Sequence, residues 1–302
     1  MRRGSARLDG FRLAWLILLP WLLILPGSGI SQHIAPLPGV TPSKTVPRPA
    51  EVRLAEQRRL EAALAALKPQ RPDMVDAYVV VAALHSDPVF GREAREAGRV
   101  LSRRFDAEGR TVTLVAGPDD GSVLPASPDS LATVLAKVGQ LADPKQDVVV
   151  LYATSHGSPA GGLQYHDPRR GFGSVPPERL ARLVEASGMP NRLVILSACY
   201  SGVFLPRLSS PTSIVITAAA PDRASFGCTP GNDWTFFGDA LVNRALRKPQ
   251  PLAAAFEEAR SLVTGWESRV RLVNSNPQIS MGAEVPRWLA PLEKRMPTKA
   301  SQ

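Results

Sequence analysis

The chain is poor in cysteine and in aromatic residues. Of its 302 residues only two are cysteine, Cys199 and Cys228, which is too few for a zinc ribbon or a disulfide-dense scaffold. Aromatic residues make up 6%, and the basic residues form no block interleaved with them, so a nucleic-acid partner is not expected. Charged residues at 21% and apolar residues at 44% exclude wholesale disorder and a coiled coil. We therefore expect a globular chain with a sizeable core.

A third of the net positive charge lies at the N-terminus. The net charge is +9, but four arginines and one acid lie in residues 1–29, which leaves 32 basic against 26 acidic residues. These arginines precede an apolar run, residues 13–26, and then small residues, which is the layout of a secretory signal. The run is short for a membrane span. We expect residues 1–29 to be a signal peptide or an N-terminal membrane anchor, and the chain to be exported to the periplasm or the extracellular space.

Three further segments frame one large domain. Residues 30–50 hold five prolines and no acidic residue, which predicts an extended, unpacked linker. Residues 51–70 have leucines at helical spacing and then prolines, which predicts an accessory helix. The main domain is expected over residues 73–290, and residues 291–302 are expected to be a disordered tail.

From residue 78 onward, short β-branched runs alternate with amphipathic stretches. This alternation predicts βα units and an α/β fold with a mostly parallel sheet. The predicted strands cover residues 78–84, 111–115, 148–152, 193–196 and 214–217. Among the predicted helices, one begins where Ser127 caps it and Pro128 occupies its first turn.

Two residues with catalytic chemistry follow strands of the predicted sheet. His156 comes four residues after the run that ends at Tyr152, and Cys199 follows the run LVILS. Because parallel strands end at one edge of a sheet, both side chains are expected at the same rim. An imidazole within hydrogen-bond distance can take the proton of a thiol. Gly157 has no Cβ, so its N–H and that of Cys199 are candidates for an oxyanion hole.

Ordinary explanations exist for these residues as well. A cysteine after a strand is usually a small hydrophobe, and in an oxidising compartment Cys199 and Cys228 can form a disulfide. His166 and Asp167 lack a third ligand at useful spacing, so no metal is expected, and His85 is interpreted as a loop residue. The glycines after the third strand do not lead into a helix, so no nucleotide cofactor is expected.

At these positions the chain resembles the legumain-like cysteine peptidases, the asparaginyl endopeptidase family, which has a caspase-like fold. The resemblance covers about residues 75–285 and rests on VVVLYATSHGS and LVILSACYSG, continuing through VITAAAPDRASFGC and TFFGDAL. The histidine-to-cysteine spacing of 43 residues also suits caspase-like enzymes. The resemblance implies a three-layer α/β/α peptidase domain. In it Cys199 would be the nucleophile, His156 the acid and base, and the amides of Gly157 and Cys199 the oxyanion hole.

The resemblance also implies a substrate pocket and departures from the family pattern. The positions that match the family's primary pocket are Arg92, Asp239 and Ser225. Ser155 and Ser197 stand where family members carry acids, so Ser197 would make the pocket less negative, and no asparagine near residue 90 matches the histidine-orienting one. The expected function is a cysteine endopeptidase that cleaves peptides or proteins after Asn or Asp through an acyl-enzyme thioester. A transpeptidase with the same dyad and a catalytically dead caspase-like binding module are the alternatives.

Overall fold

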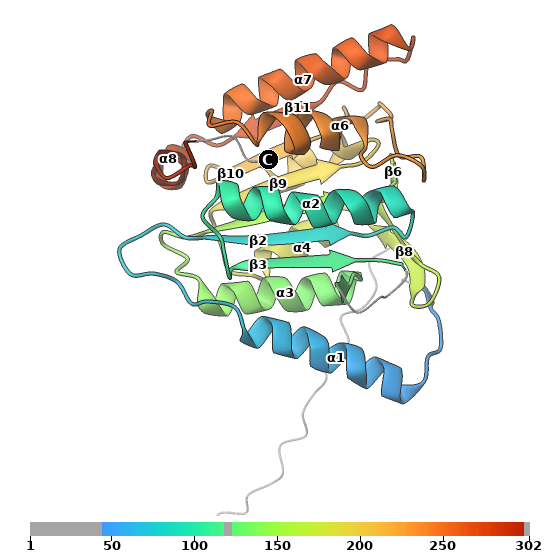
Figure 1. The fold of residues 1–302 in the computed structure, drawn as a ribbon, viewed down its shortest axis with the longest axis vertical. Helices are drawn as coiled ribbons and strands as arrows, with labels where there is room; N and C mark the ends of the chain where they lie inside the picture. Colours follow the sequence, from blue (N-terminus) through green and yellow to red (C-terminus); the bar gives the residue numbers. More distant parts are fainter. Residues whose placement is uncertain (1–43, 118–122, 299–302) are drawn as a thin grey trace, which may run out of the picture. The chain divides into compact units, whose positions relative to one another are not determined.

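The computed structural model describes residues 44–117 and 123–298 (Figure 1). The expected signal or anchor segment, residues 1–29, lies outside the described residues. In the part that is described, no helix is long and apolar enough to cross a membrane.

A seven-stranded sheet lies at the centre of the fold. Its order is β11-β10-β9-β5-β2-β3-β4, and all neighbours are parallel except β11, which runs antiparallel to β10. The strands are β2 (Ala77–Ala83), β3 (Thr111–Val115), β4 (Leu124–Pro125), β5 (Val148–Thr154), β9 (Arg192–Ser197), β10 (Ser213–Thr217) and β11 (Gln278–Met281). Strands β2, β5 and β10 are buried along their whole length, as parallel strands covered on both faces should be. The predicted mostly parallel sheet is confirmed.

Helices cover both faces of this sheet and complete three layers (Figure 1). Successive residues of β2 point to opposite faces, so that Val79 and Val81 lie in one apolar core and Val80 and Ala82 in the other. The first core is shared with α2 (Pro88–Arg104), α6 (Phe236–Gly238), the π-helix η2 (Asp239–Ala245), α7 (Leu252–Arg269) and α8 (Pro286–Lys294). The second is shared with α1 (Ala50–Ala65), α3 (Pro128–Leu141), α4 (Pro177–Glu185), the 3-10 helix η1 (Ser201–Phe204) and α5 (Leu205–Leu208). The expected α/β/α arrangement is confirmed.

Several expected boundaries are corrected. The tail expected from residue 291 begins inside α8, where Leu292 is 1% exposed because it packs into the first core. The accessory helix ends at Ala65, ahead of the prolines, and not at residue 70. The expected linker is not unpacked throughout, since Lys44–Thr45 forms β1 and pairs with β8. The helix start at Ser127 is confirmed, because its hydroxyl accepts from the Ser130 N–H at 3.0 Å.

The structure also contains a second, antiparallel sheet, whose strands were not among those predicted above. Its order is β1-β8-β7-β6, and its remaining strands are β6 (Gly157–Ser158), β7 (Gly162–Asp167) and β8 (Gly171–Val175). Because β6 begins one residue after His156, this sheet stands beside the carboxyl ends of the main parallel strands. It therefore forms part of the frame around the candidate site (Figure 1).

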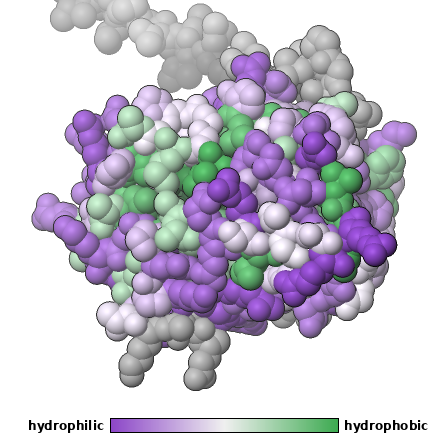
Figure 2. Space-filling model, turned by 90° about the horizontal axis from the view of Figure 1, so that it is seen from above, coloured by the Kyte–Doolittle hydropathy of each residue, from purple (hydrophilic) through white to green (hydrophobic). Residues whose placement is uncertain are grey.

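The surface on the α7 side is a patchwork in which hydrophilic residues surround smaller hydrophobic patches (Figure 2). The segment that follows α7 exposes several large apolar side chains, among them Val270, Leu272 and Val273. Single exposed apolar residues are common on soluble domains, so we assign this face no function.

A buried carboxylate joins α2 to the start of α6. Glu93 is fully buried and accepts from the Tyr152 hydroxyl at 2.6 Å, from the Thr235 N–H at 2.9 Å and from the Thr235 hydroxyl at 2.8 Å. Burial, and then the charge of Glu93, raises the pKa of Tyr152 well above its ordinary value, so the phenol keeps its proton and donates. A Cβ at Gly238 would lie 2.2 Å from the Glu93 carboxylate. Thr235 is thus held in a fixed place between the two helices.

Replacement of Glu93 should therefore destabilise the domain. In Glu93→Ala the buried donors of Tyr152 and Thr235 lose their acceptor, and we expect the free energy of unfolding to fall by about 3 kcal/mol. Denaturant unfolding measures this change. The matched control is Glu108→Ala on an exposed turn, which should change stability by less than about 0.5 kcal/mol. Equal effects of the two substitutions would contradict the role given to Glu93.

Candidate active site

Three neighbouring parallel strands end in register at one rim of the main sheet. The last residues of β2, β5 and β9 are aligned with one another across the sheet. His85, His156 and Cys199 each lie two residues beyond the end of these strands, in that order. The chain therefore places the three side chains at one edge, where we expected His156 and Cys199 to meet.

His156 and Cys199 line one hollow with an empty volume of about 210 Å³. Apart from His156, the side chains around it are hydroxyl, apolar or thiol groups. They are those of Phe90, Ser155, Ser197, Ala198, Ser225, Phe226, Cys228 and Thr235. The hollow thus combines the expected nucleophile and base with walls that carry no carboxylate or guanidinium.

Two hydrogen bonds join the Cys199 thiol to the backbone of Ser225. The Ser225 N–H donates to Sγ at 3.3 Å, and the thiol donates to the Ser225 carbonyl at 3.2 Å. Burial raises the pKa of Cys199, and hydrogen bonds from backbone N–H groups offset only part of that increase. The resting thiol is therefore protonated at neutral pH and needs a base when it attacks.

The chain turns sharply directly after Cys199. Tyr200 has a φ of 57°, in the left-handed region, and its N–H donates to the Arg223 carbonyl at 2.8 Å. A residue with a side chain adopts this conformation at a cost of about 1 kcal/mol. The turn ends the extended chain that follows β9 and begins η1, so that Cys199 lies at its tip.

Gly157 lies against the backbone of Cys199. A Cβ at residue 157 would lie 2.0 Å from the Cys199 carbonyl oxygen and 3.2 Å from Cβ of Ala198. Only glycine allows the two chain segments to approach so closely. The two segments expected to supply oxyanion-hole amides are therefore in contact.

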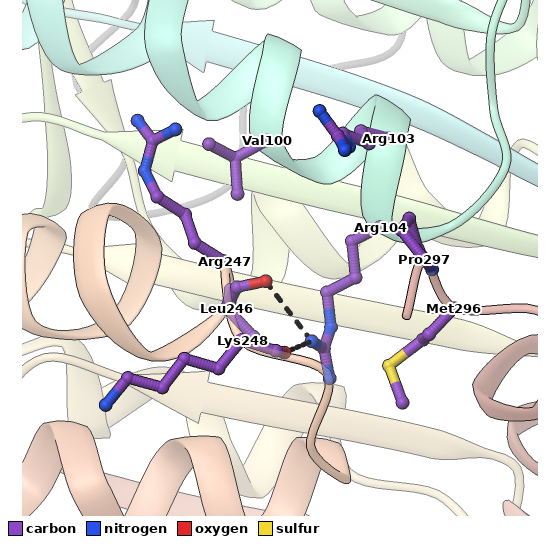
Figure 3. Close-up of a pocket in the computed structure, with 8 residues that line it drawn as sticks. All are labelled: Val100, Arg103, Arg104, Leu246, Arg247, Lys248, Met296 and Pro297. Atoms are coloured by element: carbon purple, nitrogen blue, oxygen red, sulfur yellow. Dashed lines mark hydrogen bonds between the residues drawn. The ribbon is translucent and has the colours of Figure 1, made fainter. Parts of the chain in front are cut away.

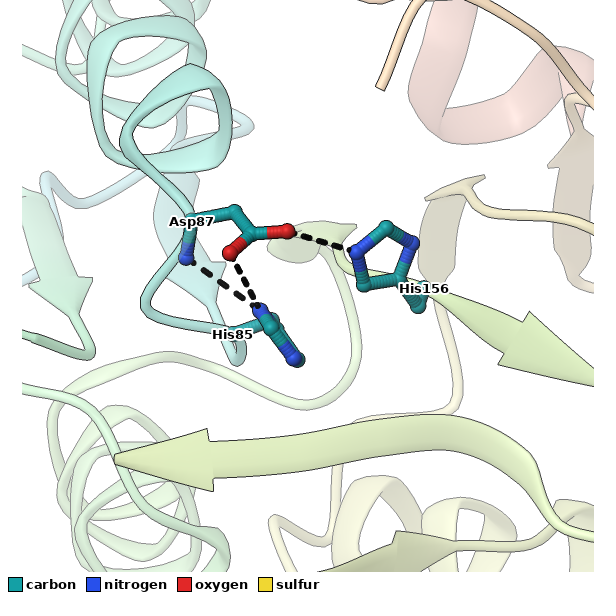
Figure 4. Close-up of side chains that lie close together, drawn as sticks. All are labelled: His85, Asp87 and His156. Atoms are coloured by element: carbon teal, nitrogen blue, oxygen red, sulfur yellow. Dashed lines mark hydrogen bonds and ion pairs between the residues drawn. The ribbon is translucent and has the colours of Figure 1, made fainter. Parts of the chain in front are cut away.

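Asp87 orients the imidazole of His156. Its Oδ2 lies 2.8 Å from His156 Nε2 (Figure 4). The Phe90 ring packs edge-on against the imidazole. Asp87 occupies the N-cap of α2, yet its carboxylate caps no backbone N–H. Asp87 was not predicted in this role, for which the family resemblance implies an asparagine near residue 90. The sequence feature that could have identified it is Pro88, which marks a helix start and makes Asp87 the N-cap.

His85, interpreted above as a loop residue, contacts Asp87 and His156. Its Nδ1 accepts from the Asp87 N–H at 3.2 Å, and its ring lies 4.6 Å from that of His156. Burial, and then the neighbouring His156, lowers the pKa of His85 to about 4. His85 is therefore neutral at physiological pH and adds no charge beside His156.

The comparison with known families agrees with this geometry. A family model described as the Peptidase C13 family matches residues 122–282, more than half of the chain, and the match includes His156, Gly157 and Cys199. The chain belongs to the Peptidase C13 family. This is the legumain family of cysteine peptidases, so the resemblance seen in the two motifs is confirmed. The protein is a cysteine-type peptidase, and its substrates are peptides or proteins.

This chain is similar in structure to a solved caspase. It is the crystal structure of caspase-1 from Spodoptera frugiperda, with a TM-score of 0.46 and 13% sequence identity, over 72% of this chain and 93% of that chain. No curated protein matches the chain significantly in sequence.

In this C13 peptidase Arg92 and Asp239, both expected in the substrate pocket, pair with other residues. Arg92 donates to two carbonyls of the loop at residues 230–232 and pairs with Asp233, 3.2 Å away. Asp239 pairs with Arg244, 3.1 Å away. Arg92 and Glu93 are neighbours on α2, and the orientation of the helix about its axis decides which of them faces the core. Glu93 is turned inward, and Arg92 is left on the exposed side. Neither residue lines the hollow around Cys199, and their place in the substrate pocket stays a prediction.

The two serines expected in the pocket do line the hollow. Ser197 is 2% exposed, and its hydroxyl lies 3.1 Å from that of Thr235. Ser225 is 8% exposed and contacts the thiol through its backbone. Thr235, which Glu93 holds in place, was missed although it opens the TFFGDAL motif and caps α6 by accepting from the Gly238 N–H.

A second pocket lies at the far end of α2 (Figure 3). At a rise of 1.5 Å per residue, about 25 Å of helix separates it from Asp87. Its central side chain, Arg104, donates to the carbonyls of Leu246, Lys248 and Gln250, which follow η2. The lining contains no cysteine or histidine, so this pocket is not the site of a cysteine-type peptidase.

The raised pKa of Cys199 predicts the pH dependence of its alkylation. Iodoacetamide reacts with the thiolate, so its rate with Cys199 should rise with pH to a midpoint above that of free cysteine measured in parallel. Cys228→Ser removes the second thiol, and Cys199→Ala gives the background rate. A midpoint below neutral pH would indicate a preformed thiolate and contradict the description of the resting thiol.

Proposed function

We propose that Cys199 and His156 form the catalytic dyad of this peptidase and that it hydrolyses peptide bonds through an acyl-enzyme thioester. The observation that carries the proposal is the shared register of β5 and β9, which brings both residues to one hollow. The Asp87 carboxylate and the Phe90 ring hold the imidazole, which supports a role for His156 in proton transfer.

In the proposed reaction the thiol sulfur attacks the carbonyl carbon of the scissile peptide while His156 takes the thiol proton. The amides of Gly157 and Cys199 stabilise the oxyanion, which the close contact of their backbones supports. His156 then gives the proton to the departing amine, leaving a thioester on Cys199. Water, deprotonated by His156, attacks the thioester and releases the acid product. The Asp87 carboxylate stabilises the imidazolium formed in each step.

We also propose cleavage after Asn, with Asp accepted less well. The walls of the hollow carry hydroxyls, those of Ser155, Ser197, Ser225 and Thr235. The Ser225 hydroxyl can donate to an amide oxygen. The other three donate their protons within the protein and can accept from the NH2 group of the amide. No guanidinium is among the lining residues, so a charged Asp side chain has no counter-ion there. No carboxylate lines the hollow to receive Lys or Arg.

Export of the chain is part of this proposal. It rests on the arginines and the apolar run within residues 1–29, followed by the prolines of residues 30–50.

Replacement of the proposed nucleophile should abolish hydrolysis. In Cys199→Ala, kcat/KM for a peptide substrate should fall by at least about a thousandfold while the unfolding midpoint changes little. His156→Ala should have a comparable effect. Cys228→Ser, in the same hollow, is the matched control and should retain activity. Substantial hydrolysis by Cys199→Ala would remove the dyad from the account.

The neutral hollow predicts a pH-dependent substrate preference. With fluorogenic peptides that differ only in the residue before the cleaved bond, Asn should be hydrolysed fastest at neutral pH and Lys should be rejected. The Asp-to-Asn ratio should rise as pH falls toward about 4, because the substrate carboxyl becomes protonated. Arg92→Ala should change kcat/KM by similar factors for all peptides, since Arg92 holds a loop. A preference for basic residues, or a loss in Arg92→Ala confined to Asn peptides, would contradict this pocket.

A further inference from the structure

Two histidines and one aspartate face one another at the rim, from separate elements. His85 follows β2, Asp87 begins α2 and His156 follows β5 (Figure 4). Each carboxylate oxygen of Asp87 faces one ring: Oδ2 lies 2.8 Å from His156 Nε2, and Oδ1 lies 3.7 Å from His85 Nδ1. The three ligand atoms offered by these side chains all lie within 4.8 Å of one another.

Between His85 and Asp87, two atoms that carry lone pairs face each other. Because the Asp87 N–H donates to His85 Nδ1 at 3.2 Å, that nitrogen carries a lone pair and its ring proton lies on Nε2. The same nitrogen faces Asp87 Oδ1, which is an acceptor only. No proton is available between these two atoms. A cation placed between them would take the His85 lone pair from the Asp87 N–H and would bind the carboxylate oxygen that faces it.

The donor set selects the class of cation. Two imidazole nitrogens and one carboxylate oxygen suit Zn²⁺ and other divalent transition metals, and not Mg²⁺ or Ca²⁺, which take oxygen ligands. In a tetrahedral zinc site with bonds of about 2.1 Å, ligand atoms lie about 3.4 Å apart, so small side-chain rotations would suffice. Side-chain exposures of 14%, 33% and 28% for His85, Asp87 and His156 leave access from solvent.

We propose that His85, Asp87 and His156 form an inhibitory site for Zn²⁺, with the fourth position taken by water. Zinc would bind His156 through Nε2, the nitrogen that now faces Asp87. The other ring nitrogen of a zinc-bound neutral imidazole carries the proton, so His156 would be unable to take the proton of Cys199. The inhibitory consequence rests on the proposed dyad, whereas binding of the metal does not.

Metal binding is measured on the untagged full chain by calorimetric titration with Zn²⁺ and by the visible absorption of Co²⁺. Cys199→Ala, which needs no activity, should bind one Zn²⁺ with the affinity of the unsubstituted chain. His85→Asn should weaken binding at least about tenfold, and His156→Asn gives an independent loss of a ligand if His85→Asn fails to fold. His166→Asn is the matched control. Its ring lies 4.9 Å from that of His85, but its Nδ1 contacts Ser86, so it should bind normally.

Inhibition is measured with a peptide substrate. Zn²⁺ should inhibit at the concentrations at which it binds, and EDTA should restore activity. Unchanged Zn²⁺ affinity in both His85→Asn and His156→Asn would overturn the site, and so would loss of binding in Cys199→Ala, which would make the thiol a ligand. If Cys199→Ala binds Zn²⁺ as described but the unsubstituted chain hydrolyses no peptide, the metal site stands and the proposed function alone fails.

Discussion

The parallel register of β2, β5 and β9 is the constraint on which the site depends. Because the strands end level with one another, three short extensions of two residues each bring His85, His156 and Cys199 to one rim. A slip of one residue between β5 and β9 would turn the side chains of one strand to the opposite face of the sheet. The buried Val, Ile and Leu residues of these strands specify the register through both apolar cores, so the core itself holds the proposed dyad in place.

Helix α2 adds the polar part of the arrangement. It begins five residues after β2 ends, so its N-cap, Asp87, comes to the same rim and contacts His156. Glu93, six residues further along the chain, is turned into the core and holds Thr235 against the hollow. One helix thus supplies the carboxylate that orients the base and the carboxylate that fixes a wall of the hollow. Arg92, between them, is turned away toward an exposed loop.

Much of this was predictable from the sequence, because long buried strands and a capped helix have strong local patterns. The five parallel strands, the helix start at Ser127 and the meeting of His156 with Cys199 at one rim all followed from such patterns. The role of Asp87 did not, since an aspartate at a helix start is ordinarily a cap and its carboxylate here turns to a histidine from another strand. The contacts of Arg92 with the loop at residues 230–233 were not predicted, for a related reason. A motif match fixes a position along the helix, but the packing of Glu93 against Tyr152 and Thr235 fixes which neighbour faces inward.

The protonated state of the resting thiol affects its oxidation in the compartment outside the cytoplasm to which we propose that the enzyme is exported. Cys199 and Cys228 are both free thiols that line the same hollow, which is the arrangement in which oxidation would join them and end catalysis. Disulfide formation begins with a thiolate, and burial raises the pKa of both residues. For Cys228 the nearby Cys199 raises the pKa further, since two thiolates would repel. The burial that raises the pKa of Cys199 therefore lowers the fraction of thiolate from which a disulfide can form, and the proposed dyad would gain resistance to oxidation at the expense of resting reactivity.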